Sequence, residues 1–372
     1  MRIAVLTRRF FRAGGGAETY AIELVRALSS RHEVHVFCQE TDEPLPHVHH
    51  HRLWTPGEKP RWVNQLVFAW TSWRATRRGF DAVHSHENTW HGTVHTIHVR
   101  PLRHNLFHAR RGVAWLIRAL KTALSPRLLT YLWLEGARFA PGTPRHVVAT
   151  SQALRTECLQ AYPHAPVTVI TPGVSVPVNP MSASAARRSL GLPEGRPCLL
   201  FVANDYARKG LDTVLQALAR LPAEVHLAVV GSRRPQTTYQ AKAEQLGLGA
   251  RVHFLGPLSD VAPAYQAADL LVHPTREDSY AMVVLESMAH GLPVVVSASP
   301  WCGIAAELRD GHEAVLLTDP HDAAALTTHI QRLLADDEHR HHLAQAGRAF
   351  AAQRSWEHAA LEYETLFRQA SA

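Results

Sequence analysis

The chain has 372 residues, 46% of them hydrophobic and 19% charged, and its 39 Lys and Arg against 32 Asp and Glu give a formal charge of +7. The length corresponds to two or three domains of about 150 residues, the composition excludes a disordered or collagen-like chain, and without an apolar run of about 18 residues we expect no membrane span. The four cysteines are far apart and include no C-x-x-C pair, so we expect no disulfide framework or zinc ribbon, and a reducing cytosol as the compartment.

In the first half of the chain, apolar runs typical of strands alternate with patterns typical of helices. A short apolar run at 2–7 is followed at 18–28 by apolar residues at helical spacing. Further strand-like runs are found at 33–38, 82–85, 94–99, 147–150 and 167–170. Alternation of this kind predicts a parallel sheet with helices on both faces.

Pro, Ser and Gly then concentrate at 172–197, which indicates a linker. The alternation resumes after this segment. Strands are expected at 198–203, 226–230, 252–255, 270–273 and 294–297, helices at 211–220 and 239–246, and a terminal amphipathic helix at 355–369.

The predicted fold class is therefore α/β, with two Rossmann-like, doubly wound parallel-sheet domains. We place the N-terminal domain at 1–175 and the C-terminal domain at 190–354, with the segment 355–370 as a candidate to pack back on the first. Ligands of such sheets bind outside the carboxyl ends of the strands, so we expect a site in a cleft that the two domains face.

The charge is divided unevenly along the chain. Residues 1–180 hold 22 Lys and Arg against 11 Asp and Glu (+11), whereas residues 181–372 hold 17 against 21 (−4), and the two sum to +7. A basic half suggests a polyanionic partner, which could be a nucleic acid, an anionic membrane or a phosphorylated substrate. An Arg-rich background without such a partner is the alternative.

A run of three glycines, Gly14 to Gly16, lies between the first strand and the first helix. Glycines at such a place let backbone amides approach an anion at a helix N-terminus. A dinucleotide-binding G-x-G-x-x-G fingerprint would need glycine at position 19, where Thr19 stands, so a dehydrogenase is disfavoured. A purely structural glycine turn remains the alternative.

Two adjacent basic residues, Arg208 and Lys209, follow the first strand of the second domain in the segment NDYARKG, which begins at Asn204. A guanidinium and an ammonium at the carboxyl end of a strand can together hold a diphosphate. The alternative is a solvated charge pair on a loop.

The segment HPTREDSYAMVVLESM starts at His273, where a strand is expected to end. Asp278 or Ser279 can cap the helix that follows, and Glu286 can then present its carboxylate to a pair of vicinal hydroxyls. This pattern suits a sugar nucleotide, although Asp278 could be only a cap and Glu286 only an exposed residue. The amides expected at the positive end of the helix dipole are those of Tyr280, Ala281 and Met282.

The chain resembles the retaining glycosyltransferases of family 4, which have the GT-B fold, in five segments. The counterpart of their E-x7-E segment is DSYAMVVLESMAHGLPVVVS, and that of their donor-phosphate segment is FVANDYARKGLDTVLQAL. Their N-terminal glycine loop is similar to RRFFRAGGGAETYAIELVRAL, their acceptor-side strands to VHSHENTWHGTVHTIHV, and their terminal helix to SWEHAALEYETLF. The resemblance covers nearly the whole chain, and within the family it is nearest to the lipopolysaccharide core glucosyltransferases.

The resemblance implies a role for each matching residue. Asp278 replaces the first Glu of E-x7-E, a catalytic position near the anomeric centre, and Glu286 matches the second Glu, which holds the ribose. Arg208 and Lys209 match the basic pair on the diphosphate. The other donor-side residues taken as substrate-binding are Asn204, Tyr280, Ala281 and Met282.

On the acceptor side, the resemblance places Gly15 and Gly16 in the loop that closes on the phosphates and acceptor. His98 matches a catalytic histidine near the sugar and acceptor. Ser175 stands where the family usually has an acid, so no role is carried to it. A core or surface role is expected for three further histidines, His84, His86 and His91.

The implied reaction moves a hexose from a nucleoside diphosphate sugar, bound by the C-terminal domain, to a saccharide or glycolipid hydroxyl, bound by the N-terminal domain. No residue obviously serves as a covalent nucleophile, so the resemblance favours a same-face route in which the departing phosphate helps to deprotonate the acceptor. Because the chain contains no D-x-D, and Arg208 and Lys209 can replace a metal, we expect no metal and no cofactor.

Three alternatives remain open from the sequence. They are a sugar-nucleotide epimerase on the same fold, a noncatalytic glycolipid-binding protein, and a nucleic-acid binder, for which no recognised module is found, so no nucleic acid is expected. Residues 100–121 mix Arg, Lys, Trp and Leu, which is typical of a helix on an anionic membrane surface, although an ordinary helix packed on the sheet would look similar. We expect a cytoplasmic protein, peripheral at the inner face of the plasma membrane.

Overall fold

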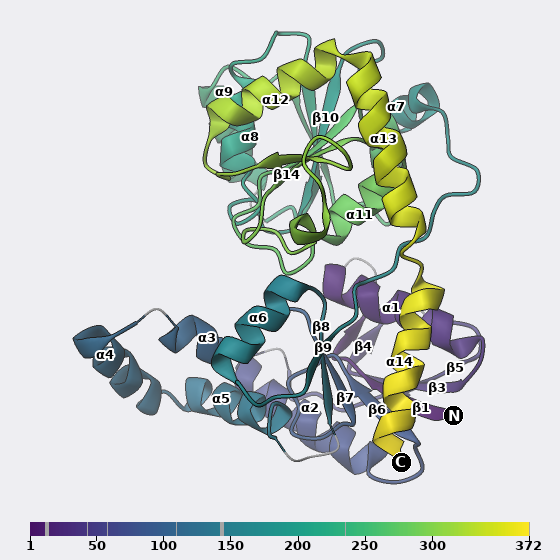
Figure 1. Ribbon diagram of the computed structural model, residues 1–372, viewed down its shortest axis with the longest axis vertical. Coiled ribbons are helices and arrows are strands. Elements are labelled where there is room, and N and C mark those ends of the chain that lie inside the picture. Colours follow the sequence, from purple (N-terminus) through teal and green to yellow (C-terminus); the bar gives the residue numbers. More distant parts are fainter. Residues whose placement is uncertain are drawn as a thin grey trace. The chain divides into compact units, whose positions relative to one another are not determined.

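The computed structural model describes residues 1–11, 15–42, 44–57, 59–108, 110–141, 145–234 and 236–371. The chain divides into two compact units, which are Met1–Gly173 together with Trp356–Ala372, and Val174–Ser355 (Figure 1). Each unit is a parallel sheet with helices on both faces, so the predicted α/β class with two doubly wound sheets is confirmed. Within the described ranges, no helix combines the length and the apolar character needed to cross a bilayer.

Unit 1 is built on a seven-stranded sheet in the order β5-β3-β1-β6-β7-β8-β9, and every neighbouring pair is parallel. The edge strand β5 was not predicted, because three of its five residues are histidines and it has no apolar run. The strands are β1 (Arg2–Leu6), β3 (Glu33–Cys38), β5 (Val48–Arg52), β6 (Ala82–Ser85), β7 (Val94–Ile97), β8 (His146–Ala149) and β9 (Val167–Val169), and a small ribbon pairs β2 (Arg9–Phe10) with β4 (Glu40–Thr41).

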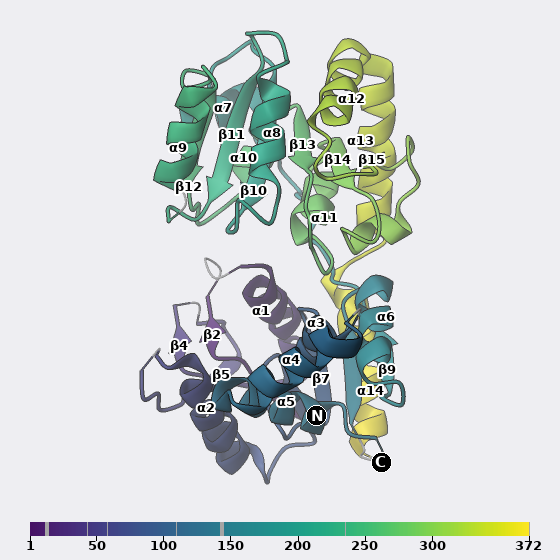
Figure 2. The ribbon, with the colours of Figure 1, turned by 90° about the vertical axis from the view of Figure 1, so that its left-hand side faces the viewer.

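The last helix of the chain belongs to unit 1, where it packs against α1 and against β6 and β7 (Figure 1; it is the yellow helix at the right of unit 1 in Figure 2). It does so because Trp356, Tyr363 and Phe367 recur at helical spacing and form one buried stripe. The helices of this unit are α1 (Gly16–Ser29), α2 (Arg61–Thr76), α3 (Leu102–Phe107), α4 (Gly112–Ala123), α5 (Pro126–Arg138), α6 (Gln152–Ala161) and α14 (Trp356–Ser371).

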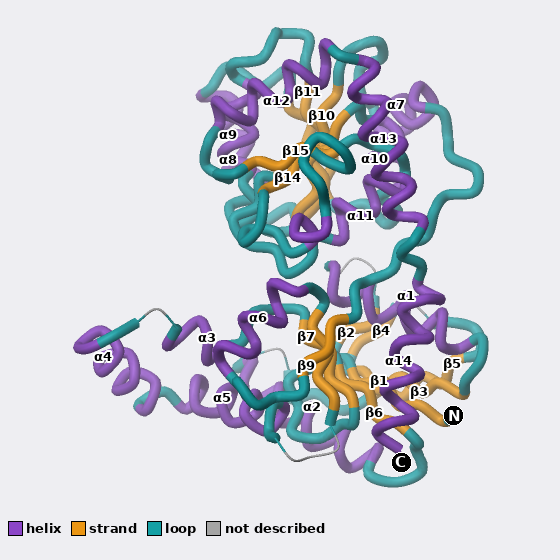
Figure 3. The backbone as a smooth tube through the Cα atoms, in the orientation of Figure 1, coloured by secondary structure: helices purple, strands orange, loops and turns teal. Residues whose placement is uncertain are grey.

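Unit 2 has a six-stranded parallel sheet in the order β12-β11-β10-β13-β14-β15, which lies between two layers of helices in Figure 3. The central strands are apolar along most of their length because both faces are buried. The strands are β10 (Cys198–Ala203), β11 (His226–Gly231), β12 (Val252–Gly256), β13 (Leu270–His273), β14 (Val294–Ser297) and β15 (Val315–Leu317). The helices are α7 (Ala183–Leu190), α8 (Leu211–Leu218), α9 (Gln236–Gln245), α10 (Ala262–Ala267), α11 (Met282–Ala289), α12 (Ala323–Ala335) and α13 (Asp337–Ala352), with a 3-10 turn at Ile304–Glu307.

The linker expected at 172–197 is only partly irregular, because it contains helix α7. The Ser182 hydroxyl accepts a hydrogen bond from the Ala185 amide, and Gly191 ends the helix with a φ of 65°. Ser and Gly, which suggested a linker, here cap the two ends of a short helix.

Candidate functional site

The carboxyl ends of β10 and β13 meet at one edge of the unit 2 sheet, since these two strands are parallel neighbours. The loops that follow them are joined by a hydrogen bond of 2.9 Å from the Arg276 amide to the Arg208 carbonyl. Gly210 permits this approach, because its φ is 85° and a Cβ there would lie 2.0 Å from the Pro274 oxygen. The predicted basic pair and the predicted acidic segment are therefore brought together.

Lys209 and Asp278 form a largely buried ion pair between these two loops. Lys209 Nζ donates to Asp278 Oδ2 at 2.5 Å and to the Glu277 carbonyl at 2.9 Å. The two side chains are 15% and 17% exposed. Two of the three ammonium protons are thus used within the protein, and the third is available for an anion.

The Asp278 carboxylate is bonded through both of its oxygens. Oδ2 also lies 3.2 Å from His273 Nε2, and Oδ1 accepts from the amides of Ala281 at 2.9 Å and Tyr280 at 3.4 Å. Burial raises the pKa of Asp278, but the hydrogen bond from His273 and the charge of Lys209 outweigh it, so the pKa is lowered. Burial lowers the pKa of His273, which leaves a neutral imidazole beside an ionised carboxylate.

The prediction that Asp278 caps the next helix is wrong in its register. Helix α11 begins only at Met282, and its N-cap is Ala281, which has a left-handed φ of 74° and no side-chain cap. Asp278 instead binds the turn before the helix. The expectation that three consecutive amides face a ligand is corrected accordingly, because those of Tyr280 and Ala281 are bonded to Asp278.

The carboxylate of Glu286, one turn into α11, is held by a residue that the sequence did not indicate. Tyr265 on α10 donates from its hydroxyl to Glu286 Oε2 at 2.6 Å, and its ring stacks on His290 at a centroid distance of 5.2 Å. Burial, followed by the charge of Glu286, raises the pKa of Tyr265, so the phenol stays protonated and donates. Tyr265 fixes where this carboxylate points.

The side chains of Asn204 and Arg208 are exposed at the end of β10. Arg208 Nε lies 3.5 Å from Asp205 Oδ2, and the Arg208 amide donates to Asp205 Oδ1 at 3.1 Å. The two predicted cations thus differ in this structure, because two hydrogen bonds within the protein hold the Lys209 ammonium, whereas the Arg208 side chain is about half exposed and is paired with Asp205.

The glycine loop of unit 1 begins helix α1. Gly15 is the N-cap, with a φ of 141° that favours glycine, and its carbonyl accepts from the Thr19 amide at 3.0 Å, while Gly16 is the first helical residue. Gly14 lies outside the described residues.

His98 lies directly after β7, which ends at Ile97 rather than at residue 99 as expected. Its Nε2 is 3.0 Å from His86 Nδ1, and its ring meets Tyr20 edge-on with centroids 5.0 Å apart. Burial, and then the charge of Arg138, lower the pKa of His98 to about 3, so the imidazole is neutral. Of the histidines expected to be structural, His86 therefore contacts a predicted site residue.

A buried polar chain supports this corner of unit 1 from the side of α14. Tyr363 shares a hydrogen bond of 2.8 Å with the Tyr20 hydroxyl and one of 2.6 Å with Thr96 Oγ1. Thr96 Oγ1 is also 2.8 Å from His84 Nε2, which places His84 in the core as expected. His91 lies apart from this chain, near Ser72.

Two family models match consecutive parts of the chain. The one described as Glycosyltransferase Family 4 matches residues 14–176, and the one described as Glycosyl transferases group 1 matches residues 182–350. A D-inositol 3-phosphate glycosyltransferase of Xylanimonas cellulosilytica is 30% identical to this chain over an alignment of 398 positions. The alignment covers 96% of this chain and 92% of that relative.

Two further comparisons concern WaaG. The lipopolysaccharide glucosyltransferase WaaG of Escherichia coli is 34% identical over 176 residues, which cover 46% of each chain. A crystal structure of WaaG, described as a glycosyltransferase involved in lipopolysaccharide biosynthesis, superposes with a TM-score of 0.84 at 23% identity, over 98% of this chain and 99% of that chain. This likeness extends over both units and concerns the fold.

Proposed function

Because this chain belongs to glycosyltransferase family 4 and has the GT-B fold, we propose that it moves a hexose from a nucleoside diphosphate sugar to a saccharide hydroxyl with retention of the anomeric configuration. The observation that carries the proposal is the cluster at the ends of β10 and β13, where a buried carboxylate holds the Lys209 ammonium at 2.5 Å. A fixed cation with one unused proton is suited to the charge that develops on a leaving diphosphate.

The donor nucleotide is expected to bind along unit 2. The Glu286 carboxylate, oriented by Tyr265, accepts from the vicinal hydroxyls of the ribose. Lys209 contacts the diphosphate, and Arg208 can reach it because its side chain is half exposed and its pairing with Asp205 is a surface contact. No step of this binding requires a metal or another cofactor.

The bonding of Asp278 supports the same-face route over a covalent one. A carboxylate that attacks the anomeric carbon must offer a lone pair, but both oxygens of Asp278 already accept from Lys209, His273 and the following turn. Asp278 therefore acts by orienting Lys209. As the bond to the sugar breaks, the phosphate oxygen gains charge opposite Lys209 and takes the proton of the acceptor hydroxyl.

An anionic glycan, as in lipopolysaccharide synthesis, is the acceptor class we propose. The two relatives are named for an inositol phosphate and for lipopolysaccharide, and residues 1–180 carry a net charge of +11. Neutral His98, next to His86 at the end of β7, is the acceptor-side residue of this proposal.

Peripheral attachment to an anionic membrane through residues 100–121 is the second part of the proposal. Helix α4 projects from unit 1 in Figure 1 and lies in front of that unit in Figure 2. It packs against α3 and α5, and Thr122 is its one buried residue. Val113, Leu116 and Leu120 are 71%, 61% and 62% exposed, and Arg118 and Lys121 lie on the same helix. An exposed apolar surface with basic residues is suited to a lipid headgroup layer.

Vesicle flotation tests the membrane proposal. We expect the protein to float with vesicles that contain anionic lipid at low salt and to be released at high salt, because the basic residues contribute about 1 kcal/mol each near an anionic leaflet. Leu116→Ser with Leu120→Ser should abolish flotation. Equal binding of the wild type to neutral and anionic vesicles, or none to either, would contradict the proposal.

A panel of sugar nucleotides tests the transfer reaction. Protein in excess EDTA is incubated with each donor, with and without a lipopolysaccharide-derived saccharide, and products are identified by mass spectrometry. We expect a saccharide that is one hexose heavier, formed only when both substrates are present. Conversion of the donor without acceptor would indicate an epimerase, and a reaction that needs added Mn²⁺ would overturn the metal-independent mechanism.

A further inference from the structure

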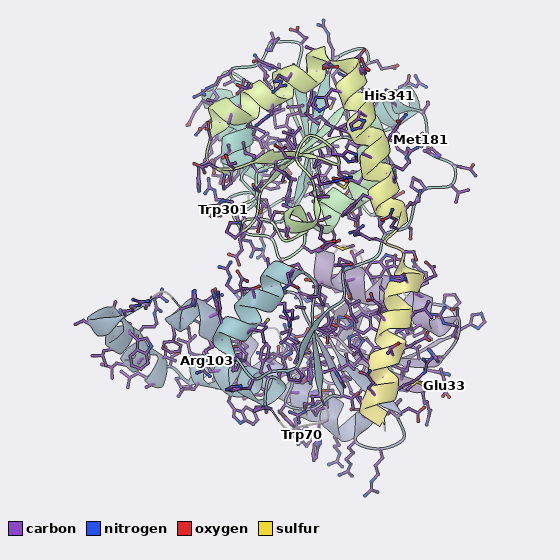
Figure 4. The ribbon with its side chains drawn as sticks, viewed as in Figure 1. Glu33, Trp70, Arg103, Met181, Trp301 and His341 are labelled. Carbon is purple, nitrogen blue, oxygen red and sulfur yellow. The ribbon has the colours of Figure 1, made fainter. Side chains whose placement is uncertain are left out.

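Three histidines and a glutamate gather at the open edge of the unit 1 sheet. Glu33 and His35 lie two residues apart on β3, and His49 and His51 lie two residues apart on the edge strand β5. Residues two apart on a strand share one face of the sheet, and the parallel register places His35 opposite His49. Figure 4 labels Glu33 on this side of unit 1.

The potential ligand atoms of three of these residues are close together. One atom each from Glu33, His35 and His49 lies within 4.8 Å of the other two, and Glu33 Oε1 is 2.9 Å from His35 Nε2. Zinc bonds of about 2.0–2.1 Å in a tetrahedral site put ligand atoms roughly 3.4 Å apart. His35 is buried and fixed, whereas Glu33 and His49 are exposed, so rotation of two surface side chains can close the remaining gap.

His51 provides a hydrogen-bond partner for the ring nitrogen of His35 that would not bind the metal. Its Nε2 is 2.9 Å from His35 Nδ1. In the metal-free structure His35 Nε2 donates to the Glu33 carboxylate at 2.9 Å. Metal binding therefore requires the other tautomer, in which Nδ1–H donates to His51 and the lone pair lies on Nε2. A hydrogen bond from the second ring nitrogen to a neighbouring group is the usual support of a metal-bound histidine.

We propose that Glu33, His35 and His49 bind a divalent transition-metal ion of the zinc class, with His51 as the supporting residue and water in the fourth position. Two imidazoles and a carboxylate suit Zn²⁺, Co²⁺ or Ni²⁺ better than Mg²⁺ or Ca²⁺, which prefer oxygen ligands. Arg2 competes with the ion, because its Nε donates to Glu33 Oε1 at 3.0 Å. Arg2→Gln should therefore tighten metal binding.

The site takes no part in the proposed transfer. The residues of the donor cluster all belong to unit 2, whereas β3 and β5 belong to unit 1 and are separated from β7, next to His98, by β1 and β6. A bound ion would link the edge strand β5 to β3 through side chains, in addition to the backbone hydrogen bonds. Its expected effect is on the stability of that edge.

Cobalt absorption with competition by zinc tests the site on the full-length, untagged protein after treatment with a chelator. We expect one Co²⁺ per chain, with the visible absorption of a four-coordinate ion that Zn²⁺ abolishes. His49→Ala and Glu33→Gln should raise the metal Kd by at least about tenfold, and His51→Ala by about 10–100-fold. His50→Gln is the matched control, because His50 is on the same strand but points to the opposite face.

Either of two results would overturn the proposal. One is the absence of stoichiometric cobalt binding by the wild type. The other is a Kd in the double variant His49→Ala with His51→Ala that equals the Kd of His50→Gln. Circular dichroism and the thermal midpoint of each metal-free variant establish that the fold is intact, so a loss of binding reports on the ligands.

Discussion

Lys209 and Asp278 form a hydrogen-bonded ion pair of 2.5 Å that joins the loop after β10 to the loop after β13. If this pair acts as a unit on the leaving diphosphate, Lys209→Ala and Asp278→Asn should each lower kcat by about one to two decades. This range follows because a charge-assisted hydrogen bond contributes roughly 1.5–3 kcal/mol. The effects should not add in the double variant, because each substitution disables the same cation. Steady-state rates of all four proteins provide the measurement, and additive losses or full activity would count against the assignment.

Tyr265→Phe removes the hydroxyl that orients Glu286. We expect binding of the nucleoside diphosphate to weaken about tenfold, because a hydrogen bond to a charged group is worth roughly 1.5–3 kcal/mol and part of this loss is recovered from water. Tyr239→Phe is the matched control, since Tyr239 also donates to a carboxylate of unit 2, Asp212, at 2.9 Å. Equal affinities for the two variants would show that Tyr265 does not position Glu286.

The buried histidines of unit 1 should make its stability depend on pH. Burial lowers the pKa of His84 and His98 to about 3 and that of His86 and His95 well below the ordinary value of 6.5. Below pH 6.5 the unfolded chain therefore binds protons that the folded unit does not, so the free energy of unfolding falls as the pH falls. Each such histidine contributes about 1.4 kcal/mol per pH unit in this window.

Urea unfolding at pH 7.5, 6.0 and 5.0 checks this expectation. Trp fluorescence reports on unit 1, because only Trp301 of the nine tryptophans belongs to unit 2. The midpoint should decrease steeply between pH 6.0 and 5.0, whereas a constant midpoint would mean that these side chains are accessible to protons in the folded unit.

The parts of the fold and site that could be predicted are those that depend on local sequence patterns, such as apolar runs. The run that became β10 is wholly apolar and the run that became β13 is apolar up to its last residue, His273. Parallel strands bring their carboxyl ends to one edge, so Lys209 and Asp278 could be expected to meet. Tyr265 could not be found in this way, because it lies 21 positions before Glu286 on a separate short helix, and only the packing of α10 brings the two together.

Backbone details and marginal elements also escaped prediction. The left-handed Ala281 delays helix α11, although no glycine or asparagine signals such a turn. Strand β5 has one apolar residue, Val48, followed by three histidines, so its pairing with β3 leaves no apolar pattern in the sequence. The projection of α4 could not be distinguished from ordinary packing, since both leave the same amphipathic pattern in the sequence.

Titration calorimetry with UDP, ADP and GDP tests the donor site most directly, because the ribose and the diphosphate are common to all three and to any sugar nucleotide. We predict that at least one of them binds the wild type, that Glu286→Gln weakens this binding at least about tenfold through loss of the charged contact to the ribose, and that Glu224→Gln, at an exposed position of the same unit, leaves it unchanged. Failure of all three to bind the wild type, or equal affinities for the wild type and Glu286→Gln, would contradict the account of how this glycosyltransferase holds its donor.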